Sequence, residues 1–379
     1  MSSRAEKLTV DLRPILLLVS VSPLFGGAET YYVKLAAMLR EIYFLRAVVC
    51  NDCLASELDA IGVEVVNVSR EANGFRRYAS TVRTIWRMRR DGRVQVAHLN
   101  GQPEAYLAPL LKLMGYRIVI TRHTPFTDQF FREGSRVPAF LKRWIATFCL
   151  SVSQGVVCVS QLLKKQLSSV VPLEKLVVIP TWVGDRFLTP RIAPKPSGIF
   201  RLLFVGRVVT NKGIFDLVEA IKRLPDVQLD VVGVGDQLDE AKRATAGLSV
   251  NFHGFREDCI TFYGACDLLV FPAPEGFEGL PQVPLEAMAM GVPCLASNIS
   301  SIREIAGDDG SVLMLFEAGD TDDLARQILR LREYPSLREE LGKAGARRVA
   351  ERFTECAVRE QYLAFFDVVF NGSPARRQG

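Results

Sequence analysis

Short apolar runs alternate with amphipathic stretches of helical period along most of the chain. Short apolar runs bounded by turn residues predict buried strands, and the longer amphipathic stretches predict helices. Seven strands are predicted in the first half, at residues 15–21, 45–50, 63–68, 94–99, 117–121, 155–159 and 176–179. Strands that alternate with helices are typical of an α/β domain whose parallel sheet is covered on both faces.

The pattern stops near residues 180–198 and then resumes. Turn-forming residues crowd this segment and predict a linker between domains: Pro180, Pro190, Pro194, Pro196 and Gly198. Further strands are predicted at residues 200–205, 227–232, 250–253, 268–271, 293–296 and 312–315, with helices that include 213–223, 281–290 and 321–332. Two open parallel sheets, with ligand-ready loops at the carboxyl ends of their strands, are expected to face one another across a cleft.

The length of 379 residues suffices for two domains with separate cores. We predict an N-terminal domain over residues 1–183 and a C-terminal domain over residues 184–352. A helix over residues 353–370 is predicted to return to the N-terminal domain. Residues 371–379, rich in Gly, Pro, Arg and Gln, are predicted to be disordered.

The mean hydropathy of +0.15 would suit a membrane protein, but the longest apolar runs fall far short of the roughly 18 residues of a spanning helix. The run at residues 15–21 follows Asp11 and Arg13 and precedes Gly26 and Gly27. These flanks favour a buried first strand over a signal peptide. The chain is therefore expected in the cytoplasm.

Eight cysteines are scattered along the chain, mostly inside apolar runs, which favours reduced thiols over a disulfide framework. Cys50 and Cys53 form a CxxC pair, yet no second pair or neighbouring histidine completes a zinc site. The sequence contains three histidines in all, which disfavours metal catalysis. We expect no cofactor.

The net charge of +5 is distributed unevenly. Residues 1–180 contain 24 Lys and Arg against 14 Asp and Glu, whereas residues 181–379 contain 23 against 28. One predicted helix combines arginines with aromatic and apolar residues: Arg76, Arg77, Arg83, Arg87, Arg89, Arg90 and Arg93 with Phe75, Tyr78, Ile85, Trp86 and Met88. Such a helix can lie on an anionic membrane surface or meet an acidic acceptor, and the solvated face of an ordinary packing helix explains it equally well. No nucleic-acid-binding motif accompanies the charge, so a nucleic-acid partner is not expected.

Gly26 and Gly27 lie between the first predicted strand and a helix that opens at Ala28 or Glu29. Glycines let a backbone approach a ligand closely, and the amides at a helix start suit a phosphate. A tight turn is the simpler explanation, and the pair lacks the GxGxxG spacing of a dinucleotide site.

A second loop, Gly-Arg-Val-Val-Thr-Asn-Lys-Gly at residues 206–213, also joins a strand to a helix. Arg207 and Lys212 project from it, and together a guanidinium and an ammonium group can neutralise a diphosphate leaving group. The alternative is a surface loop with two cations.

The residues with the most chemical potential lie at 274–289, after the strand predicted at 268–271. Here Glu278 stands in a glycine-rich loop, and Glu286 lies about one turn inside a helix that begins near Pro281. Carboxylates at these positions can accept hydrogen bonds from sugar hydroxyls while the free helix amides meet phosphate. The alternative is that an acidic residue here simply caps the helix. Capping explains one acidic residue, but it explains less well why the loop and helix carry two.

In the order in which they occur, these features resemble the retaining glycosyltransferases of family 4, which have the GT-B fold of two facing Rossmann-like domains. Glu278 and Glu286, with seven residues between them, are similar to the EX7E element of that family. Residues 26–29 resemble its first glycine loop, residues 206–213 its phosphate clamp, and residues 233–235 its mid-domain turn. The resemblance covers nearly the whole chain.

The resemblance implies a role for each of these residues. The donor diphosphate would be bound by Gly26, Gly27, Arg207, Lys212, Leu280 and Pro281. Glu286 would bind the ribose and Glu278 would lie at the transferred sugar. His123 occupies the place of a family histidine at the reaction centre, so it is predicted to be catalytic together with Glu278, whereas His98 and His253 are interpreted as structural or base-adjacent.

The chain departs from the family pattern at two places. The family loop usually puts its first glutamate directly before Gly-Phe-Gly, and here Glu275 precedes Gly-Phe while Glu278 follows it, so either carboxylate can be the one at the donor sugar. Residues 179–184 read Ile-Pro-Thr-Trp-Val-Gly where many members have Asn-Gly, and no role is assigned to them.

The implied function is retaining, metal-independent transfer of a hexose or related sugar from a nucleotide-diphosphate sugar to a glycan or lipid-linked acceptor, in bacterial cell-surface polysaccharide or lipid-linked glycan synthesis. Retention through an ion pair or through a covalent intermediate is left open. The alternatives are a GT-B nucleotide-sugar epimerase or phosphorylase, and a membrane-docked glycan-binding protein without catalysis. Cytoplasmic location is expected, either free or peripheral on the inner face of the membrane.

Overall fold

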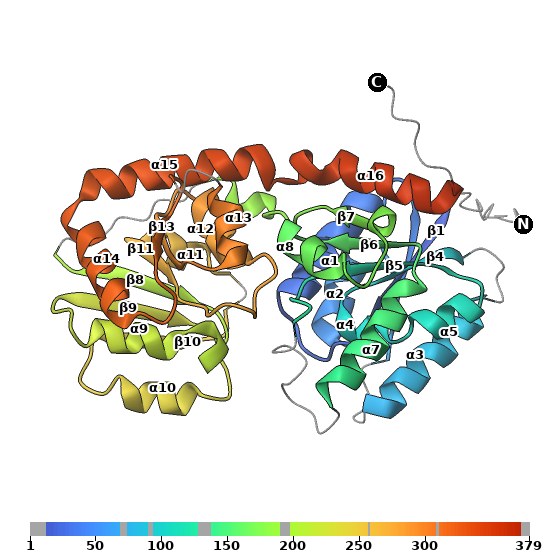
Figure 1. Ribbon diagram of the computed structural model, residues 1–379, viewed down its shortest axis with the longest axis horizontal. Coiled ribbons are helices and arrows are strands. Elements are labelled where there is room, and N and C mark those ends of the chain that lie inside the picture. The colour runs from blue at the N-terminus through green and yellow to red at the C-terminus, as the bar shows by residue number, and fades with distance from the viewer. Residues whose placement is uncertain are drawn as a thin grey trace, which may run out of the picture.

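A computed structural model describes residues 13–68, 74–89, 94–127, 138–189, 198–256, 258–307 and 311–372. Two parallel sheets, each covered by helices on both faces, lie beside one another (Figure 1). Residues 190–197 of the predicted linker and the tail from residue 373 lie outside the described residues.

The N-terminal sheet has seven parallel strands in the order β3-β2-β1-β4-β5-β6-β7. They are β1 (Ile15–Ser20), β2 (Phe44–Val49), β3 (Glu64–Asn67), β4 (Val94–Leu99), β5 (Arg117–Arg122), β6 (Gly155–Cys158) and β7 (Leu176–Val178). Every residue of β1 is buried because it lies in the middle of the sheet: Leu16 and Leu18 face one core, and Leu17 and Val19 face the other.

Helices cover both faces of this sheet. One core contains residues of α1 (Gly27–Leu39), α2 (Asp52–Ala60) and the last helix, α16 (Glu355–Asn371). The other contains residues of α3 (Gly74–Arg89), the short α4 (Gln102–Ala105), α5 (Ala108–Leu113), α7 (Ala139–Ser151) and α8 (Gln161–Leu167). The chain reverses its direction of strand addition between β1 and β4, which is where open α/β sheets bind ligands.

The C-terminal sheet has six parallel strands in the order β10-β9-β8-β11-β12-β13. They are β8 (Phe200–Val205), β9 (Val227–Val232), β10 (Val250–Gly254), β11 (Leu268–Phe271), β12 (Cys294–Ser297) and β13 (Met314–Phe316). The helices are α9 (Ile214–Ile221), α10 (Leu238–Ala244), α11 (Ile260–Ala265), α12 (Gln282–Ala289), α13 (Ser300–Ala306), α14 (Thr321–Glu333) and α15 (Pro335–Arg352). Here too the strand order reverses in the centre, between β8 and β11.

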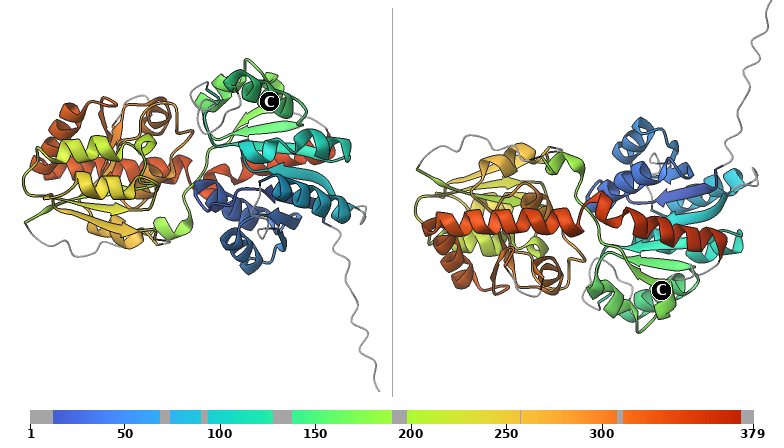
Figure 2. Two further views of the ribbon diagram at one scale, coloured as in Figure 1. Left: turned by 90° about the horizontal axis from the view of Figure 1, so that it is seen from below. Right: turned by 90° about the horizontal axis from the view of Figure 1, so that it is seen from above.

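The last two helices, α15 and α16, run across both halves of the molecule (Figures 1 and 2). Tyr362 and Phe366 of α16 are fully buried in the N-terminal core, and the ring of Phe365 lies 2.7 Å from where a Cβ of Gly155 would be. The helix therefore packs closely against the sheet. The amide of Val183 donates to the carbonyl of Phe353 at 2.8 Å, so the two crossings of the chain between the halves lie side by side.

All thirteen predicted strands are present, each within about two residues of its predicted ends. The helix after Gly26 begins at Gly27 rather than at Ala28 or Glu29. The prediction of disorder is wrong for Asn371, because this residue ends α16. Among the described residues, no helix is long and apolar enough to cross a membrane.

Candidate active site

The loops that follow the central strands of the two sheets touch one another. A Cβ at Gly279, in the loop after β11, would lie 2.1 Å from the carbonyl oxygen of His123 and 3.1 Å from Cδ1 of Leu163. Only glycine allows the two halves to approach so closely at this point. The contact brings the loop that carries Glu278 to the end of β5, where His123 lies.

Lys212 and Glu278 form an ion pair at the edge of the C-terminal sheet. Their side chains are 24% and 12% exposed, so the pair is largely shielded from water. Lys212 ends a short turn before α9, and Gly213 (φ +73°) lies so close to Pro272 that a Cβ would be 1.9 Å from its carbonyl oxygen. The loops after β8 and β11 are thereby locked together, and this places the ammonium group beside the carboxylate.

Arg207 lies in the same loop as Lys212, and its side chain is exposed. Within the described residues, no hydrogen bond or ion pair of its guanidinium is found. The loop is supported by residues 233–235, since a Cβ at Gly233 (φ +140°) would lie 1.9 Å from the carbonyl oxygen of Gly206. The amide of Val208 also donates to the carbonyl of Val234 at 3.0 Å. Arg207 is therefore an available cation on a well-supported loop.

Glu286 lies in α12, one turn from its beginning, and accepts a hydrogen bond from the hydroxyl of Tyr263 at 2.9 Å. Burial raises the pKa of Glu286, although the Tyr263 hydrogen bond and the charges of Lys34 and Arg186 oppose this shift. The Tyr263 bond uses Oε2, and within the described residues Oε1 accepts no hydrogen bond. Oε1 is therefore available for a ligand hydroxyl.

A bridge between the two halves lies next to Glu286, and the sequence analysis missed it. Nζ of Lys34, on α1, donates to Oε1 of Gln282 at 3.0 Å and to the carbonyl oxygen of Trp182. Nε2 of Gln282 in turn donates to Oγ1 of Thr181. Burial lowers the pKa of Lys34 to about 8, while the carboxylate of Glu286 opposes this shift. Lys34 lies three residues after the buried Tyr31 on α1, so the two side chains share one face of the helix. A charged residue on this otherwise buried face is the one signal in the sequence that could have indicated the bridge.

His123 lies half-buried at the end of β5, where its Nε2 lies 2.9 Å from Oδ1 of Asn100. The Nδ2 group of Asn100 donates to the carbonyl of Ala28, so Oδ1 accepts and the proton is on Nε2 of His123. The ring packs edge-on against Tyr31 at 4.6 Å. Burial, with help from Arg122 and Lys34, lowers the pKa of His123 to about 3, so the imidazole is neutral at neutral pH.

The two candidate glutamates in the loop after β11 have different partners. Oε2 of Glu275 accepts from the amide of Ser300 at 2.7 Å and from its hydroxyl at 3.1 Å, at the start of α13. Glu278 instead pairs with Lys212. The choice between them for the donor sugar stays open, but only Glu278 lies beside a predicted phosphate-binding cation.

The remaining predicted site residues lie at helix beginnings. The amide of Gly26 donates to Oε2 of Glu29 at 3.0 Å, and a Cβ at Gly27 would meet nothing within 4 Å. Leu280 is buried, and Pro281 precedes α12, whose first amides have no side-chain cap. These amides can bind an anion.

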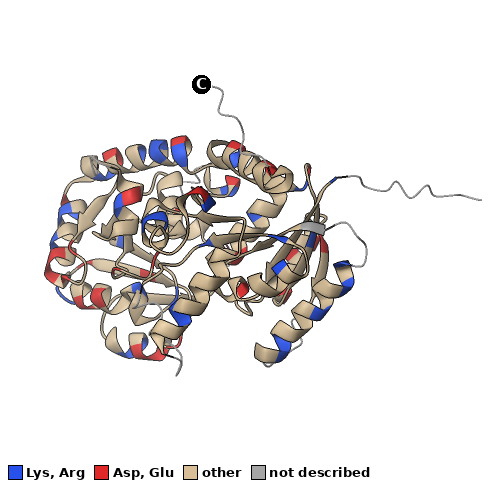
Figure 3. Ribbon diagram, turned by 45° about the vertical axis from the view of Figure 1, so that its right-hand side comes forward, with Lys and Arg blue, Asp and Glu red and all other residues tan. Residues whose placement is uncertain are grey.

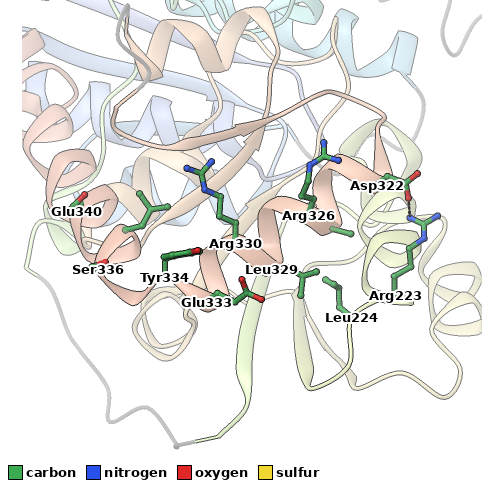
Figure 4. A pocket seen from close by; sticks show the side chains of 12 residues that line it. Arg223, Leu224, Asp322, Arg326, Leu329, Arg330, Glu333, Tyr334, Ser336 and Glu340 are labelled. Atoms are coloured by element: carbon green, nitrogen blue, oxygen red, sulfur yellow. Dashed lines mark ion pairs between the residues drawn. The ribbon is translucent and has the colours of Figure 1, made fainter.

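An open groove of about 860 Å³ lies elsewhere, between α14, α15 and the residues that follow α9 (Figure 4). Its wall includes the ion pair between Arg223 and Asp322, at 2.9 Å, and none of the predicted site residues lines it. Among the described residues, no cluster of three or more His, Cys, Asp or Glu could hold a metal ion.

Comparison with known proteins relates this geometry to a family. Residues 25–185 match the family model described as Glycosyltransferase Family 4, and residues 199–333 match that described as Glycosyl transferases group 1. The phosphatidyl-myo-inositol mannosyltransferase of Mycobacterium leprae is 30% identical over 299 residues, which cover 74% of this chain and 75% of that protein. The lipopolysaccharide core biosynthesis glycosyltransferase LpsD of Rhizobium meliloti is 31% identical over 176 residues, 45% of this chain and 50% of that protein.

Solved structures show the same architecture. The sucrose-phosphate synthase of Thermosynechococcus elongatus superposes with a TM-score of 0.82 at 20% identity, over 95% of this chain and 100% of that chain. Anabaena Alr3699/HepE in complex with UDP and glucose superposes with a TM-score of 0.80 at 18% identity, over 94% and 100%.

The fold is therefore that of the GT-B glycosyltransferases, and the predicted fold class is confirmed. Within that class, the chain belongs to glycosyltransferase family 4. Its matches to the first curated relatives span about half the length of those proteins.

The contact at Gly279 allows us to test whether activity requires the two halves to approach each other this closely. Gly279→Ala is expected to lower kcat/KM for the donor about tenfold, because the added methyl group pushes the Glu278 loop away from His123. Steady-state kinetics with the nucleotide sugar measures the effect. Gly74→Ala is the control, since a Cβ there meets nothing within 4 Å. Equal kcat/KM for Gly279→Ala and the wild type would show that the contact is not needed.

Proposed function

We propose that this protein transfers a hexose or related sugar from a nucleotide-diphosphate sugar to a glycan during the synthesis of a cell-surface polysaccharide or a lipid-linked glycan. The observation that carries the proposal is the shielded pair of Lys212 and Glu278, whose loop leads to α12 and contacts His123 at Gly279. A cation for the leaving diphosphate and a carboxylate for the sugar are thus adjacent.

The proposed donor site uses the predicted residues in distinct roles. Lys212 and Arg207 neutralise the diphosphate, and the uncapped amides of α12 and the open backbone at Gly27 contact its oxygens. Oε1 of Glu286 accepts from a ribose hydroxyl while Tyr263 holds the other oxygen. The structures of Anabaena Alr3699/HepE with UDP and glucose and with UDP-glucose support a nucleotide-sugar donor.

We further propose that transfer is metal-independent and retains the configuration of the anomeric carbon. Lys212, Arg207 and the α12 dipole supply the positive charge that stabilises the departing diphosphate. The neutral imidazole of His123 can accept at Nδ1 or donate at Nε2 next to the sugar without adding charge. Closure at Gly279 excludes water and so limits hydrolysis of the donor.

The acceptor that we propose is anionic, either lipid-linked or phosphorylated, because the N-terminal half carries the excess of Lys and Arg. Relatives named for lipopolysaccharide core biosynthesis, capsular polysaccharide biosynthesis and phosphatidyl-myo-inositol mannosyl transfer support this class.

A screen for stabilisation by nucleotide sugars, followed by product analysis, tests the function. A bound donor should raise the melting temperature, and that donor with a suitable acceptor should release free nucleoside diphosphate. Proton NMR of the product should show the anomeric configuration of the donor. Conversion of the donor without an acceptor would instead favour an epimerase, and cleavage of a glycan that requires inorganic phosphate would favour a phosphorylase. Binding of glycans without any turnover would favour a non-catalytic binding protein.

A further inference from the structure

Three helices of the N-terminal domain form one continuous outer face. Residues of α3, α5 and α7 share the core on the same side of the seven-stranded sheet, for example Ile85, Leu111 and Ala146. The helices lie side by side in the views of Figures 1 and 2. The hydroxyl of Tyr116, just after α5, donates to the carbonyl of Ile85 on α3 at 3.3 Å, and α5 also contacts α7. Their outer sides form what we call the α3/α5/α7 face.

Large apolar side chains are concentrated on this face. Of the sixteen large hydrophobic side chains that are exposed in the described part of the chain, eight lie on these three helices: Phe75, Trp86, Leu110, Leu113, Phe140, Leu141, Trp144 and Phe148. Leu113 and Phe75 are more than four-fifths exposed, at 84% and 82%. Trp144 and Phe148 stack on each other with their rings 6.3 Å apart, one turn along α7. Apolar surface concentrated in this way marks an interaction site.

The charges on the same helices all have one sign. The cations are Arg76, Arg77, Arg83, Arg87, Arg89, Lys112, Lys142 and Arg143, and the three helices contain no Asp or Glu. The helix at the lower right of Figure 3, α3, shows blue bands and no red. A partner for this face therefore has to be both anionic and able to accept apolar side chains.

An anionic lipid bilayer has both properties. Trp and Phe favour the boundary between headgroups and acyl chains, while Lys and Arg are attracted to anionic headgroups. Exposed aliphatic side chains such as Leu113 and Leu141 lack the aromatic ring on which the bases of a single strand stack, whereas they fit the hydrocarbon of a bilayer. We propose that the α3/α5/α7 face docks this protein on the surface of a bilayer that contains anionic lipids, with Phe75, Leu113, Phe140 and Trp144 inserted at the headgroup boundary.

The position of the face relative to the proposed donor site gives this docking a consequence. Helices α3 and α7 begin at the carboxyl edge of the sheet, and His123 follows β5 at the same edge. Phe75 and Phe140, near the first residues of these helices, thus lie at the end of the face that is nearer to His123. A docked protein would hold the proposed donor site near the bilayer, where a lipid-linked acceptor can reach it; this last step rests on the proposed function, whereas the docking itself does not.

Flotation of the full chain with vesicles tests the docking. The protein should float with vesicles of phosphatidylcholine mixed with phosphatidylglycerol and not with phosphatidylcholine alone, and added salt should weaken the binding. The double variants Phe140→Ser/Trp144→Ser and Arg83→Glu/Arg87→Glu should each lower the apparent affinity about tenfold. Matched controls with exposed residues elsewhere, Leu173→Ser and Arg243→Glu, should bind as the wild type does.

The outcomes separate this inference from the proposed function. Absence of binding to the mixed vesicles, or equal binding by the double variants and the wild type, would overturn the docking, as would binding to a soluble polyanion such as heparin in place of the vesicles. None of the altered residues belongs to the proposed donor site, so donor turnover with a soluble acceptor should be unchanged in all four variants. Vesicle binding without any turnover in the wild type would instead contradict the proposed function alone.

Discussion

Replacing Lys212 with methionine is expected to lower kcat/KM for the nucleotide sugar about 10²- to 10³-fold. Methionine keeps most of the length of the side chain but removes the ammonium group that pairs with Glu278. The diphosphate then loses a cation in a shielded site, where a charge interaction is stronger than in water. In addition, the carboxylate of Glu278 no longer has the ammonium group of Lys212 as its partner. The negative charges of Glu278 and of the diphosphate then repel each other.

The control for this prediction lies at the other end of the same helix. Lys222 follows α9 and pairs on the surface with Glu219 at 2.8 Å, so Lys222→Met should leave the kinetics unchanged. Steady-state rates at varied donor concentration give kcat and KM for both variants, and thermal melting shows whether each remains folded. A folded Lys212→Met protein with the kinetics of the wild type would remove Lys212 from the donor site.

The strands were predictable because their signal is local. The predicted ranges 200–205, 227–232 and 268–271 coincide with β8, β9 and β11, since each is an apolar run flanked by turn residues or charges. The order of strands within each sheet was not predicted, because apolar runs that are buried on both faces carry no information on their neighbours.

The site was only partly predictable, for a related reason. Lys212, Glu278 and Glu286 lie in compact motifs that the sequence displays directly. The contact between Lys34 and Gln282 joins residues 248 positions apart, and no local pattern indicates it. The pairing of Tyr263 with Glu286 is similar, because a tyrosine in α11 looks like an ordinary core residue until α12 is packed beside it. Local motifs thus predicted the groups that we propose for the donor site, and the folded structure was needed to find the groups that hold them in place.

The choice between Glu275 and Glu278 is also one that the sequence alone could not make. The two carboxylates lie three residues apart in one glycine-rich loop. The sequence alone does not decide which of them lies at the donor sugar. In the folded chain, Glu275 meets the start of α13 through Ser300, whereas Glu278 meets Lys212. The partners therefore differ in kind: one belongs to a helix cap and the other to the proposed diphosphate site.

We expect Glu278→Gln to lower kcat about 10²-fold while KM for the donor does not rise. Glutamine keeps the size of the side chain but removes the charge that would stabilise the sugar as the diphosphate departs. Lys212, freed from its ion pair, remains available to the diphosphate, so binding of the donor is preserved. Loss of kcat without a rise in KM is the mark of an interaction made in the transition state.

The matched variant Glu275→Gln should give the opposite result. Its carboxylate caps α13 through the amide and hydroxyl of Ser300, at 2.7 Å and 3.1 Å, so neutralising it should cost about 1 kcal/mol of stability and leave kcat near that of the wild type. Thermal melting and steady-state kinetics on the two variants measure both quantities side by side. If Glu275→Gln loses turnover while Glu278→Gln retains it, the carboxylate at the donor sugar is Glu275, and the loop must leave α13 when the donor binds.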